Sequence, residues 1–244
     1  LTGTPASSTT PAVPGVYGNK IYLLNPTSGA VLATLNTDYS VPSEARILDI
    51  NADGYADTIY AIDIKGNLYR WQLVAGETSF RNDSFTGGKL ASLSGTGDQA
   101  RRFFYAPEAA LMKYNGSTFV TIIAGSGNRE KPLDTAIQDG IFVFWDKTVL
   151  GFGALPESPI GYAQLTDVTN NVVAEGQAGS AMSAIAHDDR GWRIMLSGGE
   201  KILSSPLITG KRIFLTSYAP GQAVACSSIR GEGRLFALSQ SDGR

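Results

Sequence analysis

Gly66-Asn67-Leu68-Tyr69-Arg70-Trp71 is one of four copies of a short pattern in which a glycine precedes aliphatic and aromatic residues. The other copies span residues 18–23, 140–144 and 233–238. Short runs rich in aliphatic and aromatic residues, bounded by glycine and polar turn residues, are typical of β-strands. The pattern therefore predicts an all-β chain built from a repeated unit.

The spacing of the copies indicates the kind of repeat. Ile21 and Leu68 are 47 residues apart, and Ile141 and Leu235 are 94 residues apart, which is twice that interval. The 73 residues from Leu68 to Ile141 would require an insertion. A period in the forties is typical of four-stranded propeller blades. We therefore expect a modified β-propeller of four-stranded antiparallel blades with long insertions, either small and distorted or completed by a preceding segment.

Composition divides the chain into two parts. Residues 1–14 are mostly Thr, Ser, Ala and Pro, which predicts a flexible linker. Residues 15–244 are expected to form the propeller domain, with loops or insertions across 151–190. Residues 106–113 are compatible with either a short helix or an extended segment.

The nine residues 49–57 lie between two of the expected strands and predict a metal site. Calcium takes six to eight oxygen ligands, and loops supply them at positions 1, 3, 5 and 9 and from a carbonyl at position 7. Gly54 occupies position 6, where such a loop bends sharply. The expected Ca²⁺ ligands are Asp49, Asn51, Asp53, Asp57 and the backbone carbonyl of Tyr55.

This loop differs from an EF-hand. Position 12 is Tyr60 where an EF-hand has a bidentate glutamate, so Asp57 is expected to take the bidentate role. The flanking residues 46–50 and 58–62 have the composition of strands. The alternative is an Asx-rich turn without a metal, but three carboxylates in one turn would repel each other unless a cation neutralised them.

Charge and cysteine content exclude several classes of protein. The formal net charge is −2 and no run of Lys or Arg is present, which disfavours binding to nucleic acid. No apolar run is long enough to cross a membrane. Cys226 is the only cysteine, so an internal disulfide is impossible. Because the chain begins at Leu1, we interpret it as a processed product or a piece of a longer protein.

Several motifs resemble, in their order, the C-terminal β-propeller of the PilC/PilY family of type IV pilus tip proteins. The resemblance covers roughly residues 44–240. Its motifs are the 49–57 loop and residues 66–71, 102–108, 125–134, 191–192, 199–207 and 233–238.

The resemblance implies a secreted or surface-held protein, exported through the periplasm to the pilus tip or the outer-membrane surface. It also implies minor pilins of the tip complex as partners, calcium-dependent control of pilus extension and retraction in twitching motility, and an adhesin role towards a host or abiotic surface. The long N-terminal region of the family is not part of this sequence, and neither is an Arg-Gly-Asp tripeptide.

Other chemistries fit the sequence less well. Ser126 lies in a Gly-Ser-Gly turn but lacks the strand-to-helix setting and the histidine base of a hydrolase nucleophile. His187, the only histidine, lies in a polar loop beside Asp188 and Asp189 and is interpreted as solvated. We therefore expect a protein without catalytic residues or a bound organic cofactor.

Two alternatives stay open. A quinoprotein-type dehydrogenase has similar blade repeats and uses calcium, but a contiguous loop that nearly saturates the ion would leave little coordination for the cofactor. A surface module that binds carbohydrate or protein, with purely structural calcium, is the second alternative. Trp71, Trp145 and Trp192 would be its stacking platforms, although such residues are more often part of a core.

Overall fold

The structure is a computed structural model that describes residues 17–74, 77, 80–172, 185, 189–221 and 231–244. Within these residues the long elements are all β-strands, and the helical residues form 3-10 turns of three residues each. The prediction of an all-β chain is confirmed. Residues 1–14, His187 and Cys226 lie outside the described part, and the interpretations made for them are not tested.

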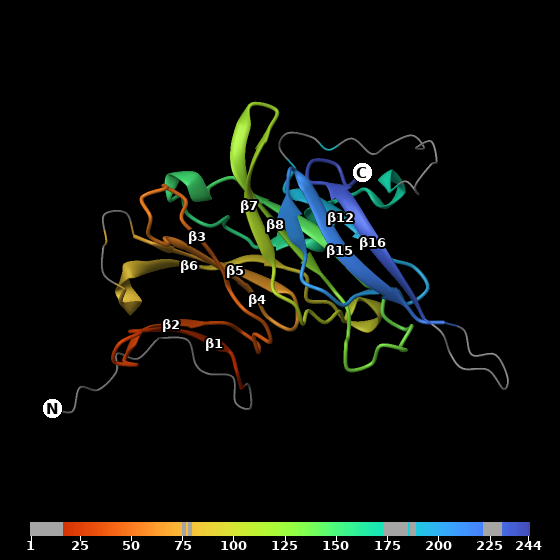
Figure 1. The fold of residues 1–244 in the computed structure, drawn as a ribbon, viewed down its shortest axis with the longest axis horizontal. Coiled ribbons are helices and arrows are strands. Elements are labelled where there is room, and N and C mark those ends of the chain that lie inside the picture. Colours follow the sequence, from red (N-terminus) through yellow and green to blue (C-terminus); the bar gives the residue numbers. More distant parts are fainter. Residues whose placement is uncertain (1–16, 75–76, 78–79, 173–184, 186–188, 222–230) are drawn as a thin grey trace.

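The strands form four open sheets (Figure 1). Sheet A pairs β1 (Lys20–Leu24) with β2 (Val31–Asn36). Sheet B contains β3 (Arg46–Leu48), β4 (Thr58–Ile62), β5 (Asn67–Leu73), β6 (Phe85–Ser92) and β10 (Ile160–Gly161). Sheet C contains β7 (Glu108–Tyr114), β8 (Ser117–Gly125), β9 (Gly140–Asp146), β12 (Gly191–Met195) and β11 (Thr166–Asp167). Sheet D contains β13 (Lys201–Ile202), β14 (Leu207–Thr209), β15 (Arg212–Ala219) and β16 (Glu232–Ser239).

Sheets B and C are built to the same plan. Each is an antiparallel meander of four strands, and a two-residue strand at the sheet edge pairs in parallel with the fourth. The short 3-10 turns lie in the connections: η1 (Asn82–Ser84), η2 (Gly97–Gln99), η3 (Val149–Gly151), η4 (Tyr162–Gln164) and η5 (Thr169–Asn171). The chain thus uses one supersecondary unit twice.

The four glycine-led patterns all form strands, as predicted. They correspond to β1, β5, β9 and β16. β5 and β9 are each the third strand of a meander, and β16 is third in the series β14, β15, β16. Residues 106–113, for which helix and extended structure were both open, belong largely to β7.

Alternation of side chains explains how the sheets pack. Tyr60 and Ile62 of β4 belong to the core between sheets B and C, whereas Ile59 and Ala61 face sheet A. β9 alternates in the same way, with Phe142 and Phe144 towards sheet B and residues 141, 143 and 145 towards sheet D. Successive residues of a strand point to opposite faces. Sheets B and C are therefore covered on both faces, which is why β4, β5 and β9 are buried along their whole length.

Sheets B and C are also joined by a buried ion pair. Nη1 of Arg70, on β5, donates hydrogen bonds to both carboxylate oxygens of Asp146, at 2.8 and 2.9 Å. The hydroxyl of Tyr60 donates to the same carboxylate at 2.9 Å. A buried pair of this kind is costly to break, because removal of one partner leaves an uncompensated charge. It therefore fixes the relative position of the two central sheets.

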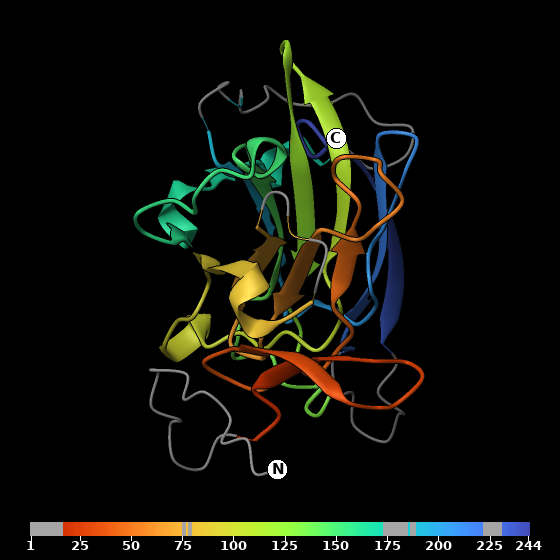
Figure 2. The same ribbon diagram turned by 90° about the vertical axis from the view of Figure 1, so that its left-hand side faces the viewer.

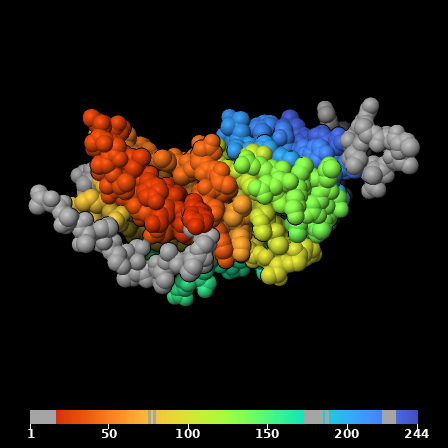
Figure 3. Space-filling model, turned by 90° about the horizontal axis from the view of Figure 1, so that it is seen from below, coloured from red at the N-terminus to blue at the C-terminus, as the bar shows by residue number. Residues whose placement is uncertain are grey.

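The order of the sheets follows the sequence along the molecule. Figure 2 shows sheet A lying across one side of the other sheets, and the β7–β8 hairpin extending beyond them. The space-filling view in Figure 3 shows the early residues at one end and the late residues at the other. β7, an edge strand of sheet C, contacts both β3, an edge strand of sheet B, and β14 of sheet D.

Candidate functional site

The 49–57 loop connects two strands, as the sequence predicted. Leu48 is paired with Thr58, and the amide of Asp57 donates to the carbonyl of Leu48 at 3.0 Å. The turn is made at Gly54, where φ is +92°, a left-handed conformation that strains other residues. The loop is the orange segment beside β3 in Figure 1. It is therefore a hairpin connection at the end of sheet B.

Carboxylates of the loop are hydrogen-bonded to its own backbone. Asp49 accepts from the amides of Asp53 at 3.2 Å and Gly54 at 2.8 Å. Asp53 accepts from the amide of Tyr55 at 2.9 Å and from the side-chain amide of Asn51 at 3.0 Å. Each of these two carboxylates therefore receives one hydrogen bond on each oxygen and keeps lone pairs for another partner.

Asp57 has a different environment. Its side chain is buried, with the residue 5% exposed, and its oxygens accept from the amides of Ile50 and Asn51 at 3.1–3.3 Å. The hydroxyl of Thr58 also donates to it at 3.0 Å. Asp57 thus ties the end of the loop back to its beginning, and most of its acceptor capacity is used.

The residue types of the loop fit a calcium ion, because all the side-chain atoms that could ligate a metal are hard oxygens. The arrangement does not gather them around one point. In the residues that the structure describes, no three or more His, Cys, Asp or Glu side chains form a metal-ligating group. The loop thus brings Asp49, Asn51, Asp53, Tyr55 and Asp57 into one turn, and an ion would require their oxygens to rotate towards a common centre.

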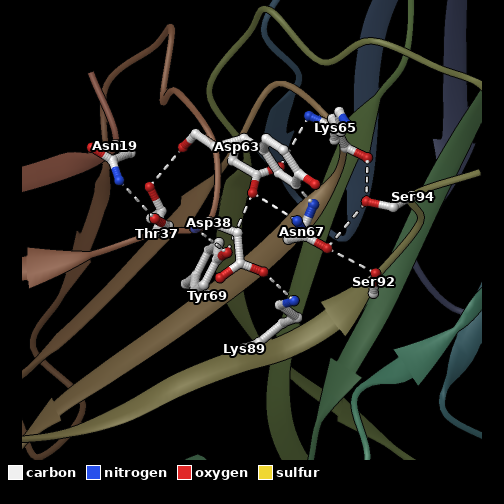
Figure 4. Close-up of polar contacts among 11 residues, drawn as sticks. Asn19, Thr37, Asp38, Asp63, Lys65, Asn67, Tyr69, Lys89, Ser92 and Ser94 are labelled. Carbon is white, nitrogen blue, oxygen red and sulfur yellow. Dashed lines mark hydrogen bonds and ion pairs between the residues drawn. The ribbon is translucent and has the colours of Figure 1, made fainter. Parts of the chain in front are cut away.

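A second polar cluster joins sheets A and B, and the sequence did not predict it (Figure 4). Asp63 is fully buried and accepts from the amides of Lys65 and Asn67 at 3.0 Å, and from the Asn67 side chain at 2.7 Å. The hydroxyl of Tyr69 donates to it at 3.3 Å and accepts from the amide of Asp38 at 2.8 Å. The only sequence signal was the Asp-Ile-Lys-Gly-Asn turn that precedes β5.

Burial raises the pKa of the Asp63 carboxyl above its usual range, while the hydrogen bonds from Asn67, Lys65 and Tyr69 oppose this shift. These donors satisfy the carboxylate within the protein. The cluster therefore has the character of a structural joint between the sheets.

Three motifs of the family resemblance meet at a shallow cavity of about 560 Å³. Phe104 and Tyr105 come from the segment before β7, Arg129 from the loop after β8, and Ser205 from the segment before β14. The guanidinium of Arg129 lies 4.9 Å from the centre of the Phe104 ring, a cation–π contact. The fold thus brings together residues that are up to 101 positions apart in sequence.

Ser126 and the tryptophans are structural. Ser126 is fully buried, donates to Asp139 at 2.7 Å and accepts from the amide of Gly140 at 3.0 Å, so it links β8 to β9. Trp71, Trp145 and Trp192 are buried at 6%, 1% and 0% exposure, which confirms them as core residues. Across the described residues, no helix is long and apolar enough to cross a membrane.

The curated proteins that this chain resembles are type IV pilus biogenesis factors. No protein-family model matches the chain. It is 24% identical over 228 residues to the type IV pilus biogenesis factor PilY1 homolog of Xylella fastidiosa strain Temecula1, covering 85% of this chain and 15% of that protein. It is 25% identical over 218 residues to the type IV pilus biogenesis factor PilY1 of Pseudomonas aeruginosa, covering 73% of this chain and 19% of that protein.

A solved structure shares the fold. The crystal structure of the Pseudomonas aeruginosa PilY1 C-terminal domain superposes with a TM-score of 0.66 at 19% sequence identity. The match covers 93% of this chain and 53% of that one. The chain therefore spans less than a fifth of the curated relatives and about half of the solved domain. The resemblance to the PilC/PilY C-terminal domain is confirmed by sequence and by fold.

Proposed function

We propose that this chain, which resembles the C-terminal domain of PilC/PilY proteins, acts in type IV pilus biogenesis as a calcium-binding domain without catalytic activity. The observation that carries the calcium proposal is the 49–57 loop, which holds four oxygen-bearing side chains and a glycine turn between two strands. Asp49, Asn51, Asp53, Asp57 and the Tyr55 carbonyl would hold the ion. Bound calcium would neutralise the three carboxylates and fix the shape of an exposed loop.

We also propose that the sheets are blades of a modified propeller. This proposal is supported by the repeated plan of sheets B and C and by the equivalent third-strand positions of β5, β9 and β16. It is further supported by contacts of β7 with β3 and β14, because the inner strands of neighbouring blades approach one another near a common axis.

The biological role is inferred from the relatives, which are described as pilus biogenesis factors. We propose that the domain lies outside the cell, at the pilus tip or the outer-membrane surface, and contacts minor pilins or other tip components. Calcium in the loop would bias pilus extension against retraction and so control twitching motility. Adhesion to a host or abiotic surface would be a further role of the same tip.

Calorimetric titration of calcium tests the proposal. The wild-type chain should bind one ion with a dissociation constant between about 10⁻⁷ and 10⁻³ M, the range of sensor and extracellular sites. Asp57→Ala and the isosteric Asp49→Asn should each weaken binding by at least about 100-fold, since each removes a charged ligand. Asp83→Asn, outside the loop and largely exposed, is the matched control. Unchanged binding in both loop variants would contradict the proposal.

A motility assay tests the biological part. A strain that produces the full-length protein with Asp49→Asn should retain surface pili but lose the calcium dependence of twitching. Normal calcium-dependent twitching in this strain would show that calcium binding by this loop does not control the pilus.

A further inference from the structure

A cavity of about 360 Å³ lies directly beside the 49–57 loop. One wall is the second half of the loop, with Tyr55 and Ala56. The opposite walls are the end of β5 with the residue after it, Leu73 and Val74, and Phe152 at the end of η3. Figure 1 shows the orange loop next to the green η3 turn. Three separate segments of sequence therefore enclose one space.

The lining of this cavity is mainly apolar and partly exposed. Tyr55 is 71% exposed and Val74 is 40% exposed. When another apolar group covers apolar groups that contact water at a concave site, the free energy of the system falls. The volume is near the lower end of the range for ligand sites, which suits one bulky side chain with part of its backbone.

The charges around the cavity all have one sign. Asp53, Asp57 and Glu77 line it, and neither Lys nor Arg is among the described lining residues. Arg81 approaches Glu77 at 3.8 Å but does not line the cavity. An acidic rim around an apolar centre favours a partner that combines an apolar side chain with neighbouring positive charge, and disfavours an acidic one.

We propose that this cavity is a docking site for a partner peptide that inserts an aromatic or branched aliphatic side chain, with Lys or Arg on either side contacting the acidic rim. The cavity would hold one anchor residue of the peptide. In this binding mode a single buried side chain supplies most of the binding energy. The partner is a protein segment, since its flanking charges must lie a few ångströms to each side of the anchor.

The position of the cavity couples this docking site to calcium, a step that rests on the proposed function. Asp53, Tyr55 and Asp57 belong both to the loop and to the cavity wall. A calcium ion held by Asp53 and Asp57 would neutralise two of the three carboxylates that line the cavity, so it would weaken binding of a peptide with flanking Lys or Arg. Coupling between two sites is reciprocal, so the peptide would weaken calcium binding by the same factor.

Two substitutions test the docking site and the calcium site independently of each other. Tyr55 lines the cavity and would give calcium only its backbone carbonyl, so Tyr55→Ala removes its side chain from the wall and keeps the ligand. Asp49 is a candidate ligand that does not line the cavity, so Asp49→Asn removes the ion and keeps the wall. Tyr22→Ala, at an exposed tyrosine on β1, is the matched control for loss of a surface aromatic ring.

The test is titration of the labelled chain with acetyl-Lys-Phe-Lys-amide, followed by amide chemical shifts in nuclear magnetic resonance spectra with and without calcium. Shifts should concentrate at residues 55, 73, 74 and 152. Acetyl-Glu-Phe-Glu-amide and acetyl-Lys-Ala-Lys-amide should bind at least about tenfold more weakly. Tyr55→Ala should weaken the first peptide at least about fivefold with calcium binding unchanged, while Tyr22→Ala should have no effect on either.

The outcomes distinguish the docking site from the calcium site. Equal binding of the Lys-flanked and Glu-flanked peptides, or unchanged binding in Tyr55→Ala, would overturn the docking proposal whatever the calcium titration gives. Peptide binding that is the same with and without calcium, and in Asp49→Asn, would overturn the coupling and leave the docking site supported. About fivefold weaker peptide binding with calcium, a difference that is lost in Asp49→Asn, would support both.

Discussion

Strand β4 has an aspartate- and glycine-containing turn at each end, and the two turns differ in almost every physical respect. The turn before it, residues 49–57, is largely exposed and carries three carboxylates. The turn after it, residues 63–67, carries one carboxylate, Asp63, which is fully buried and accepts hydrogen bonds from four donors. The carboxylate of the short turn is thus fully hydrogen-bonded within the protein. The long turn has three carboxylates, and the amides of the loop do not use all of their acceptor capacity.

The comparison shows how similar composition serves two purposes. A buried aspartate surrounded by donors accepts a hydrogen bond from Tyr69, and the Tyr69 hydroxyl in turn accepts from the amide of Asp38 in the segment after β2 (Figure 4). Exposed aspartates that still have free lone pairs, as at Asp49 and Asp53, are available to a cation. Burial and hydrogen-bond partners distinguish a structural turn from a candidate metal loop, and residue types alone do not.

The largest expected difference between the turns comes from their glycines. Gly66 has φ of +84°, and an added Cβ would lie 2.4 Å from the Phe103 ring, so Gly66→Ala adds a clash to backbone strain. We expect it to lower the free energy of unfolding by about 4 kcal/mol. Gly54 has φ of +92° but open space around it, so Gly54→Ala should cost only about 1–2 kcal/mol. Urea unfolding of both variants measures the difference, and equal losses would contradict it.

A smaller difference is expected at the carboxylates. Asp63→Ala leaves the buried donors of Lys65, Asn67 and Tyr69 without their acceptor and should cost about 3 kcal/mol. Asp53→Ala, at an exposed position, should change stability by less than about 1 kcal/mol in calcium-free buffer. Thermal and urea unfolding would show this. If Asp53→Ala were the more destabilising variant, the loop would have the structural role that we assign to the Asp63 turn.

The smallest effect is a pH dependence. Because burial raises the pKa of Asp63 in the folded state, the folded protein binds this proton more tightly than the unfolded chain does. The stabilisation from that proton is complete below the ordinary carboxyl pKa of about 3.9 and is lost as pH rises through the raised pKa. Unfolding of wild type and Asp63→Asn from about pH 3.5 to 7 should show a steeper loss in wild type. Parallel curves would mean that Asp63 titrates normally.

Much of the local structure followed from the sequence. Each glycine-led pattern became a strand, and the 49–57 loop was expected between strands and is found between β3 and β4. Such features depend on contacts close in sequence, namely glycine turns and the alternation of side chains. The ligand set of Asp49, Asn51, Asp53, Asp57 and Tyr55 remains a prediction, since the structure brings these residues into one turn without gathering their carboxylates.

Other features could not be read from the sequence. The Arg70–Asp146 pair joins positions 76 residues apart, and Arg70 looked like an ordinary polar residue of a strand. Asp63 gave no sign of being the centre of a polar joint between two sheets. The partner of Arg70 is supplied by a different sheet, and the Asp63 cluster reaches the segment after β2 through Tyr69 and the amide of Asp38, so both features depend on how the sheets pack.

The sequence by itself determined that this chain is all-β, that a glycine-led strand pattern recurs four times, and that one loop is rich in oxygen-bearing side chains. Only the tertiary structure decided that a cavity adjoins this loop, because Tyr55, Leu73 and Phe152 come from three segments that packing alone brings together. The physical reason is one of range. Backbone geometry and side-chain alternation act over a few residues, whereas a cavity and the charges on its rim exist only after the sheets have packed.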